Sequence, residues 1–149
     1  MLFRSMKPAS NSKLRGALLA CTFAATALVS HAFAQAQAMQ VNVPFAFHNG
    51  SQRLPAGVYR LEMKSSHVIL LRGQSRSGFA MTNSKIAKTA STGKVIFTRY
   101  GDQYYLSEIW PTGSETGQQC VKSRQEKEAQ LAESWAGPIT RELALNKLP

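Results

Sequence analysis

The stretch that decides the fold class is KVIFTRYGDQYYLSEIW, residues 94–110. Apolar and polar residues alternate on both sides of Gly101 and Asp102, which is typical of two strands joined by a tight turn. A glycine at the first central position favours a two-residue type II′ hairpin turn. Pairing across this turn predicts three opposed pairs: Arg99 with Tyr104, Phe97 with Leu106, and Val95 with Glu108.

Both faces of this hairpin carry apolar bulk, so we expect it to lie centrally with a covering layer on each side. One face would hold Phe97, Tyr104, Leu106 and Trp110, and the other Ile96, Tyr105 and Ile109. Tyr104 and Trp110 are therefore predicted in the core, whereas Tyr100 and Tyr105 fit either the core or stacking against sugar rings. Arg99 over Tyr104 is a predicted cation–π pair worth about 1 kcal/mol.

Shorter strand signals precede the hairpin. Residues 40–48, QVNVPFAFH, alternate with period two, and Pro44 predicts that this strand lies at an edge or turns its proline to an unpaired side. Asn49 and Gly50 suit the two central positions of a type I′ turn. Further strands are predicted at residues 58–63, 67–72 and 79–82, and a long basic loop at 84–93.

A helix is predicted after the strands, near residues 124–135. Ser123 and Glu126 form a capping box at its start, and Gly137-Pro138 ends it. Helical spacing gathers Leu131, Ala132 and Trp135 into a narrow apolar stripe. The tail, residues 137–149, has too few apolar residues to predict an element.

These elements predict an all-β fold: a small antiparallel sandwich or barrel of about six strands with a C-terminal α-helix. The β domain would span residues 39–136. The preceding residues 1–34 have the pattern of a secretory signal peptide: a basic start, a 13-residue apolar run at 17–29, and A-x-A sites that place cleavage between 34 and 38. Two alternatives are an N-terminal anchor helix and a lipoprotein cut before Cys21. The signal-peptide interpretation places the mature protein in the periplasm or outside the cell.

The charge of the 149-residue chain is positive, with 18 Lys and Arg against 8 Asp and Glu. Residues 53–99 hold nine basic side chains and one acidic one, Glu62. Such a surface attracts anionic polysaccharides or lipid headgroups, although it also serves simply to keep a domain soluble. The candidate contacts are the cations flanked by turn residues: Arg72, Arg76, Lys85 and Lys88.

The chemistry motifs that we sought are absent from the sequence. HExxH, CxxC, GxSxG, GxGxxG and the P-loop do not occur, so we expect no metal, no cofactor and no enzymatic activity. His48 is expected at the surface beside a turn, and His67 at a strand start. Cys120, the thiol left after signal cleavage, would be either a packed small side chain or half of an intermolecular disulfide.

Four phrases, VPFAF (43–47), LPAGVY (54–59), RYGDQY (99–104) and LSEIW (106–110), together resemble a group of small, exported, uncharacterised bacterial proteins abundant in acidobacteria. The resemblance covers residues 40–135 and implies a secreted bacterial β protein, without an activity or a site residue. We therefore expect an exported, non-catalytic β domain of the bacterial envelope with a structural or binding role. Two alternatives are a small periplasmic carrier with an apolar pocket inside a barrel, and a hydrolase with an unrecognised site.

Overall fold

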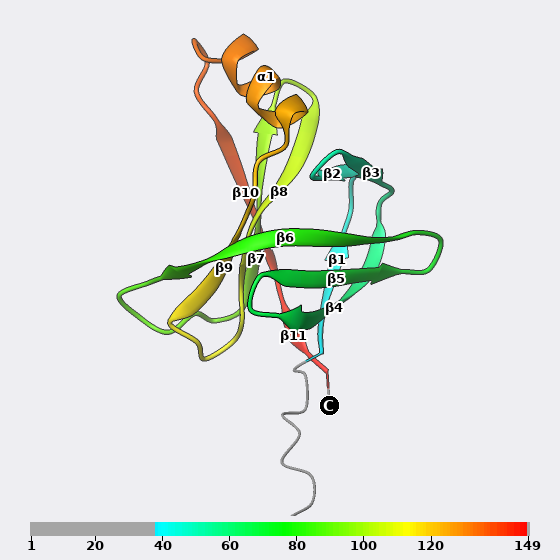
Figure 1. Ribbon diagram of the computed structural model, residues 1–149, viewed down its shortest axis with the longest axis vertical. Coiled ribbons are helices and arrows are strands. Elements are labelled where there is room, and N and C mark those ends of the chain that lie inside the picture. Colours follow the sequence, from blue (N-terminus) through cyan, green and yellow to red (C-terminus); the bar gives the residue numbers. More distant parts are fainter. Residues whose placement is uncertain (1–37, 149) are drawn as a thin grey trace, which may run out of the picture. The chain divides into compact units, whose positions relative to one another are not determined.

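The computed structural model describes residues 38–148, which hold eleven strands and one helix (Figure 1). The strands are β1 (Met39–Val43), β2 (Phe47–Asn49), β3 (Gln52–Leu54), β4 (Gly57–Ser65), β5 (Val68–Gly73), β6 (Ser77–Ile86), β7 (Lys94–Tyr100), β8 (Gln103–Trp110), β9 (Thr116–Cys120), β10 (Ile139–Ala144) and β11 (Asn146–Lys147). The helix is α1 (Arg124–Ala132). The predicted signal segment, residues 1–34, and residues 35–37 of the cleavage window lie outside the described residues.

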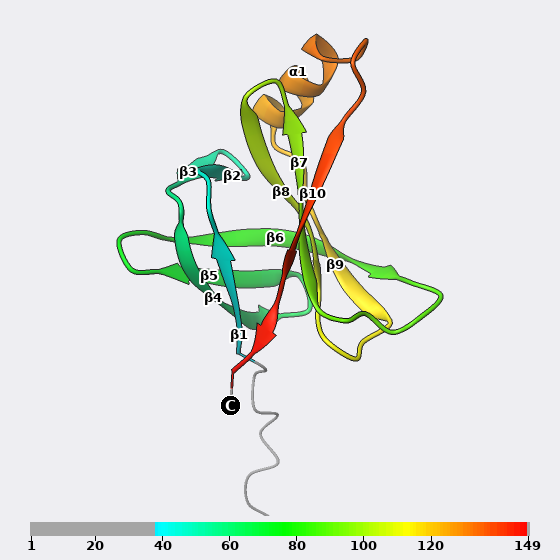
Figure 2. The same cartoon turned by 180° about the vertical axis from the view of Figure 1, so that it is seen from behind.

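The strands form one ladder in the order β10-β7-β8-β9-β6-β5-β4-β1-β11. Strand β6 connects the two halves of this ladder, because residues 77–81 pair with β5 and residues 82–86 pair with β9 (Figure 1). The two ends of the ladder, β10 and β11, are separated in the chain by Leu145 alone, and they pair with β7 and β1 respectively (Figure 2). The all-β prediction is therefore confirmed, but the ladder is not closed and has more than six strands.

The predicted strand at residues 40–48 is in fact two strands. Pro44 cannot donate a ladder hydrogen bond, and the chain leaves β1 there to form the short β2–β3 hairpin. Strand β2 then pairs in parallel with β8, which makes the sheet mixed. Asn49 pairs with Gln52, so the turn is centred on residues 50 and 51, one position later than predicted, with Gly50 at a φ of 61°.

The β7–β8 hairpin turns at the predicted residues, Gly101 and Asp102, and has two of the three predicted pairs. A bulge between Ile96 and Phe97 shifts the remaining register, so Val95 pairs with Ile109 and not with Glu108. The bulge turns Ile109 into the core, where it is fully buried. The predicted cation–π contact is present, with the Arg99 guanidinium 5.8 Å from the centre of the Tyr104 ring.

The main core lies between the two halves of the ladder and is filled by aliphatic and aromatic side chains. Phe47 stands at its centre, with ring centroids 5.3 Å from Tyr59 and 5.1 Å from Phe97 in edge-to-face geometry. Tyr104 packs partly buried against this core, while Tyr100, Tyr105 and Trp110 are buried outside it. Trp110 is buried as predicted, but the bulge turns it to the face opposite Phe97, so its predicted place in the core beside Phe97 and Leu106 is wrong.

Sequence patterns missed four strands, β3, β9, β10 and β11, and half of β6. Strand β9 (TGQQC) is polar, but Gln118 is buried because its side-chain oxygen accepts a 2.8 Å hydrogen bond from the Thr82 hydroxyl. Residues 84–86, predicted as loop, extend β6 along β9. The tail forms β10 and β11, and the side chains of β10 are mostly exposed, so that strand shows no alternating apolar pattern.

The helix begins as predicted, with the Ser123 hydroxyl accepting a 3.1 Å hydrogen bond from the Glu126 amide. It ends earlier than predicted, at Ala132. The predicted apolar stripe is not buried, because Leu131 is 75% exposed and Trp135 lies beyond the helix and is 84% exposed. Glu126 is the buried residue of this helix instead.

Candidate functional site

The four predicted cationic contacts, Arg72, Arg76, Lys85 and Lys88, do not gather in one place. Arg72 and Arg76 flank the turn between β5 and β6, whereas Lys85 and Lys88 lie at the far end of β6 and just beyond it. Ten residues of extended chain span about 30 Å, so the two pairs mark opposite ends of one strand. The structure therefore defines an arginine end and a lysine end of β6.

Arg72 is partly neutralised by Glu62 on β4. The Glu62 carboxylate lies 2.7 Å from Lys64, 3.4 Å from Arg60 and 3.6 Å from Arg72. The hydrogen bond from Lys64 is the main reason that the pKa of this carboxyl is lowered, with the nearby charges adding to it. Three cations thus share one acid on this face.

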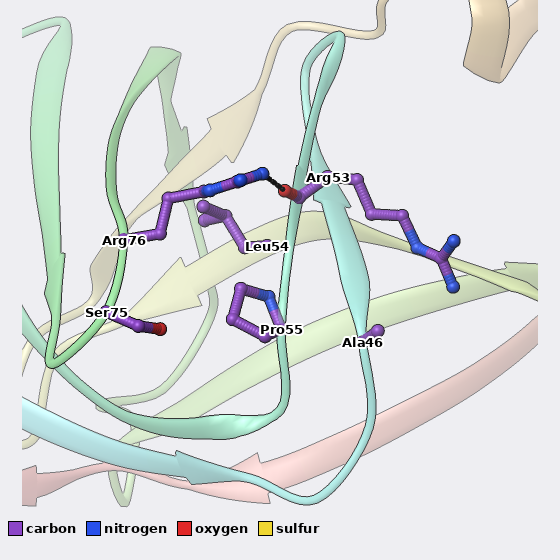
Figure 3. Close-up of a pocket in the computed structure, with 6 residues that line it drawn as sticks. All are labelled: Ala46, Arg53, Leu54, Pro55, Ser75 and Arg76. Atoms are coloured by element: carbon purple, nitrogen blue, oxygen red, sulfur yellow. Dashed lines mark hydrogen bonds between the residues drawn. The ribbon is translucent and has the colours of Figure 1, made fainter.

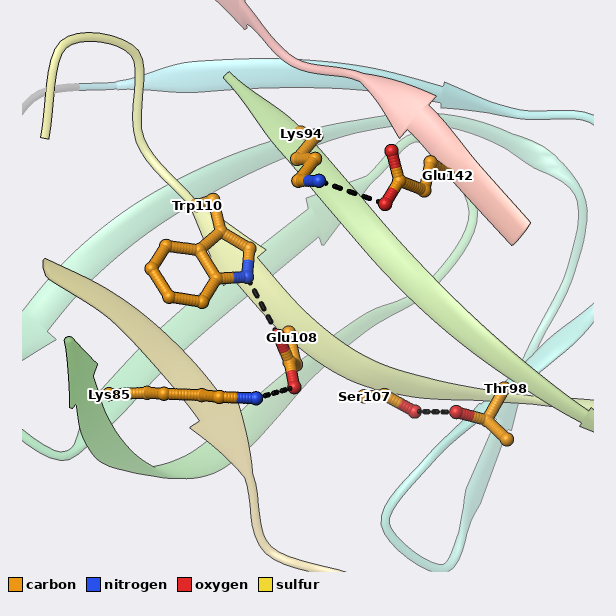
Figure 4. Close-up of polar contacts among 7 residues, drawn as sticks. All are labelled: Lys85, Lys94, Thr98, Ser107, Glu108, Trp110 and Glu142. Carbon is orange, nitrogen blue, oxygen red and sulfur yellow. Dashed lines mark hydrogen bonds and ion pairs between the residues drawn. The ribbon is translucent and has the colours of Figure 1, made fainter. Parts of the chain in front are cut away.

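At the lysine end, Lys85 is paired and Lys88 is not. Lys85 Nζ lies 2.5 Å from one oxygen of Glu108, and the other oxygen accepts a 2.8 Å hydrogen bond from the Trp110 indole (Figure 4). A second ion pair, Lys94 with Glu142 at 2.8 Å, joins β7 to β10 nearby. Lys88 is exposed in the loop after β6 and forms no ion pair within residues 38–148.

At the arginine end Arg72 shares Glu62, whereas Arg76 and the neighbouring Arg53 have no acidic partner within residues 38–148. Arg76 Nη1 donates a 3.2 Å hydrogen bond to the backbone oxygen of Arg53 (Figure 3). Between them lies a cavity of about 390 Å³. Its lining residues are Ala46, Arg53, Leu54, Pro55, Ser75 and Arg76. We call this cavity the Arg53–Arg76 pocket.

The fold fixes both walls of the pocket through Tyr59. The Tyr59 hydroxyl donates a 2.7 Å hydrogen bond to the Pro55 oxygen, which holds the β3 side. Gly73 donates to the Arg76 oxygen at 3.2 Å, and a Cβ at Gly73 would come within 2.6 Å of both that oxygen and the Tyr59 ring. Only a glycine therefore lets the Arg76 turn pack this closely.

Figure 3 shows how the two guanidinium groups lie. The Arg76 side chain reaches to the Arg53 carbonyl, while the Arg53 side chain leaves on the other side of β3, past Ala46. The charges therefore flank the segment of Leu54 and Pro55 and do not converge on one point. Such separated charges match repeated anionic groups on a polymer better than a single small anion.

Arg53 was not among the four predicted contacts, although the hairpin signal at Asn49 could have found it. Pairing in that hairpin places Arg53 opposite His48. His48 is buried, contrary to the surface position predicted for it, and its ring stacks on Tyr105 with centroids 4.9 Å apart. Burial, and then the Arg53 charge, lower the pKa of His48, so it adds no positive charge to the pocket at neutral pH.

Cys120 lies in the middle of the molecule, opposite Thr82 of β6. It is a free thiol, partly buried against the main core. Burial is the main cause that raises the pKa of this thiol to about 12, and the charges of Glu126 and Glu108 raise it further. A thiol held in its protonated form is a poor nucleophile.

The part of the chain that the structure describes holds no cluster of three or more His, Cys, Asp or Glu side chains arranged to bind a metal. It also holds no helix with the length and apolar character needed to cross a membrane. No family model, curated protein or solved structure matches this chain.

Proposed function

We propose that the protein is an exported, non-catalytic binding domain of the bacterial envelope that holds an anionic polysaccharide at the Arg53–Arg76 pocket. One observation carries the proposal: two arginines without acidic partners flank a cavity of about 390 Å³. Two of the other predicted cations, Arg72 on β5 and Lys85 on β6, already have a carboxylate beside them.

The pocket offers a surface for a sugar ring as well as charge. Ala46, Leu54 and Pro55 supply apolar atoms between the two guanidinium groups. Arginine binds carboxylate or sulfate groups through two parallel N–H donors, and its weaker hydration lowers the cost of leaving water. An acidic sugar polymer therefore fits both features, whereas a lipid headgroup would use only the charge.

Retention on a polyuronate resin tests the proposal. Arg53→Gln with Arg76→Gln should abolish retention at low salt, and wild-type retention should disappear near 0.5 M salt, where the screening length is about 4 Å. Lys85→Gln with Lys88→Gln is the matched control, because it removes the same net charge from the other end of β6. Equal loss in both variants would refute a specific pocket, and binding to anionic vesicles without binding to the resin would refute the polysaccharide.

A further inference from the structure

Strand β6 keeps a short unpaired edge in its first half. Thr82 donates a 2.9 Å hydrogen bond to the His67 oxygen, which shows that its backbone groups face the β5 side. Because backbone groups alternate sides along a strand, those of Gly78 and Ala80 also face β5, and those of Phe79 and Met81 face away from it. On that far side β9 pairs with residues 82–86 only.

The edge is bounded at both ends. Val121 donates to the Met81 oxygen at 2.9 Å, after which the chain turns away toward the helix cap at Ser123. The Gln52 side chain donates to the Ser77 oxygen at 3.2 Å. Between these two contacts, the N–H and C=O of Phe79 and the N–H of Met81 have no hydrogen-bond partner within residues 38–148.

A groove of about 350 Å³ lies along this edge. It is lined by residues 49–52, Phe79, Met81 and residues 120–123. Phe79 is 63% exposed and Met81 59% exposed, and their spacing of two residues is the spacing of side chains on one face of an extended peptide.

A buried polar group also points to a ligand in the groove. Asn49 lines it and is only 4% exposed, yet its side-chain nitrogen has no hydrogen-bond partner. An unpaired buried donor destabilises the fold, and a carbonyl oxygen placed in the groove would give it a partner. The unpaired strand edge and the unpaired amide are independent observations with the same requirement, a backbone-like partner.

We propose that this groove binds an extended peptide of another protein, which adds as a short strand to β6 at Phe79. Its carbonyl groups would accept from Phe79 N–H and Asn49 Nδ2, and its apolar side chains would lie on Phe79 and Met81. Lys122 lines the groove, so an acidic residue at that end of the peptide would complement its charge. The site uses backbone groups of β6 and is separate from the Arg53–Arg76 pocket.

A seven-residue peptide of alternating valine and glutamate is the probe. Titrated into the ¹⁵N-labelled protein, it should shift the amides of Phe79 and Met81 and the side-chain NH₂ of Asn49 saturably. The amide of Ser84, which faces the opposite side of β6, should not move. The proposal would be overturned if the Phe79 amide shows no saturable shift up to about 1 mM peptide. A dissociation constant of about 1 mM corresponds to a binding free energy of about 4 kcal/mol.

Two variants separate strand addition from apolar contact. N-methylation of the peptide at its pairing positions should weaken binding at least tenfold, and Phe79→Pro, which removes a free N–H and no ladder bond, should do the same. Phe79→Val keeps the N–H and should cost less than threefold. Equal binding of the N-methylated peptide would overturn strand addition. Concentration-dependent dimers lost in Phe79→Pro would instead assign the edge to a second copy.

Discussion

Both ends of β6 carry positive charge, but the cationic side chains at the two ends have different partners. At the lysine end, Lys85 is bound to Glu108, and Glu108 is bound to the buried Trp110. At the arginine end, Arg53 and Arg76 face solvent around a cavity and have no acidic partner within residues 38–148. The difference teaches that a charge count along the sequence cannot distinguish a structural cation from one available to a ligand.

The largest expected effect tests whether the lysine end is structural. Gly117, which pairs with Lys85, lies against the Trp110 ring so closely that a Cβ would overlap it. Gly117→Ala should therefore lower the free energy of unfolding by about 1–3 kcal/mol in urea denaturation. Gln119→Ala, at an exposed position of the same strand, is the control and should stay within about 0.5 kcal/mol of wild type. A Gly117→Ala protein as stable as that control would show that Trp110 is not fixed there.

The buried carboxyl group of Glu126, in helix α1, should make the stability of the protein depend on pH. Glu126 is 4% exposed, one of its carboxylate oxygens has no partner, and burial raises its pKa against the opposing charge of Lys122. The stability that a raised carboxyl pKa contributes is complete below the unfolded value of about 4.5 and is lost as pH rises through the folded value. Glu126→Gln should thus stabilise the protein at pH 7, on the order of 1 kcal/mol, because a buried charge costs more than a neutral amide.

The same gain should vanish near pH 4, where wild-type Glu126 is already protonated. Thermal unfolding of both proteins at pH 4 and pH 7 measures the difference. The lowered pKa of His48 makes the protein less stable as pH falls, which is the opposite trend. Because both proteins contain His48, this contribution cancels when the variant is compared with wild type. A Glu126→Gln protein that is less stable than wild type at pH 7 would mean that the carboxylate has a partner when folded.

A smaller effect distinguishes the cations themselves. Lys85→Gln removes the ion pair with the half-buried Glu108 and should cost up to about 1 kcal/mol at low salt, with less loss at high salt. Arg76→Gln removes one exposed hydrogen bond and should cost less than about 0.5 kcal/mol. Chemical denaturation at two salt concentrations measures both. The reverse order of the two losses would make Arg76 the structural cation.

The part of the fold that sequence predicts best is the β7–β8 hairpin, because Gly101 sets a two-residue turn and apolar residues mark both strands. Strands β9 and β10 could not be predicted, because neither has an alternating apolar pattern. They are strands because β9 pairs with β6 and β10 pairs with β7. The bulge that turns Ile109 inward likewise has no local signal.

One of the two arginines of the candidate site could be predicted from the sequence. Arg76 follows from its place in a turn, but its proximity to Arg53, 23 residues away in the chain, depends on how Tyr59 and Gln52 join three segments. The pairing of Lys85 with Glu108 is also a tertiary contact over 23 residues. Sequence therefore located the basic region, and only the fold shows which of its cations remain unpaired.

The most direct test of the central claim is calorimetric titration with one soluble polyuronate oligomer at several salt concentrations. For Arg53→Gln with Arg76→Gln, the account predicts at least a tenfold loss of affinity. The slope of log affinity against log salt concentration should also become shallower by about two, because about two fewer counterions are released on binding. For Lys85→Gln with Lys88→Gln it predicts a change below about threefold, since Lys85 is already paired. Equal losses of affinity in the two double variants would contradict the account, because net charge alone would then explain binding.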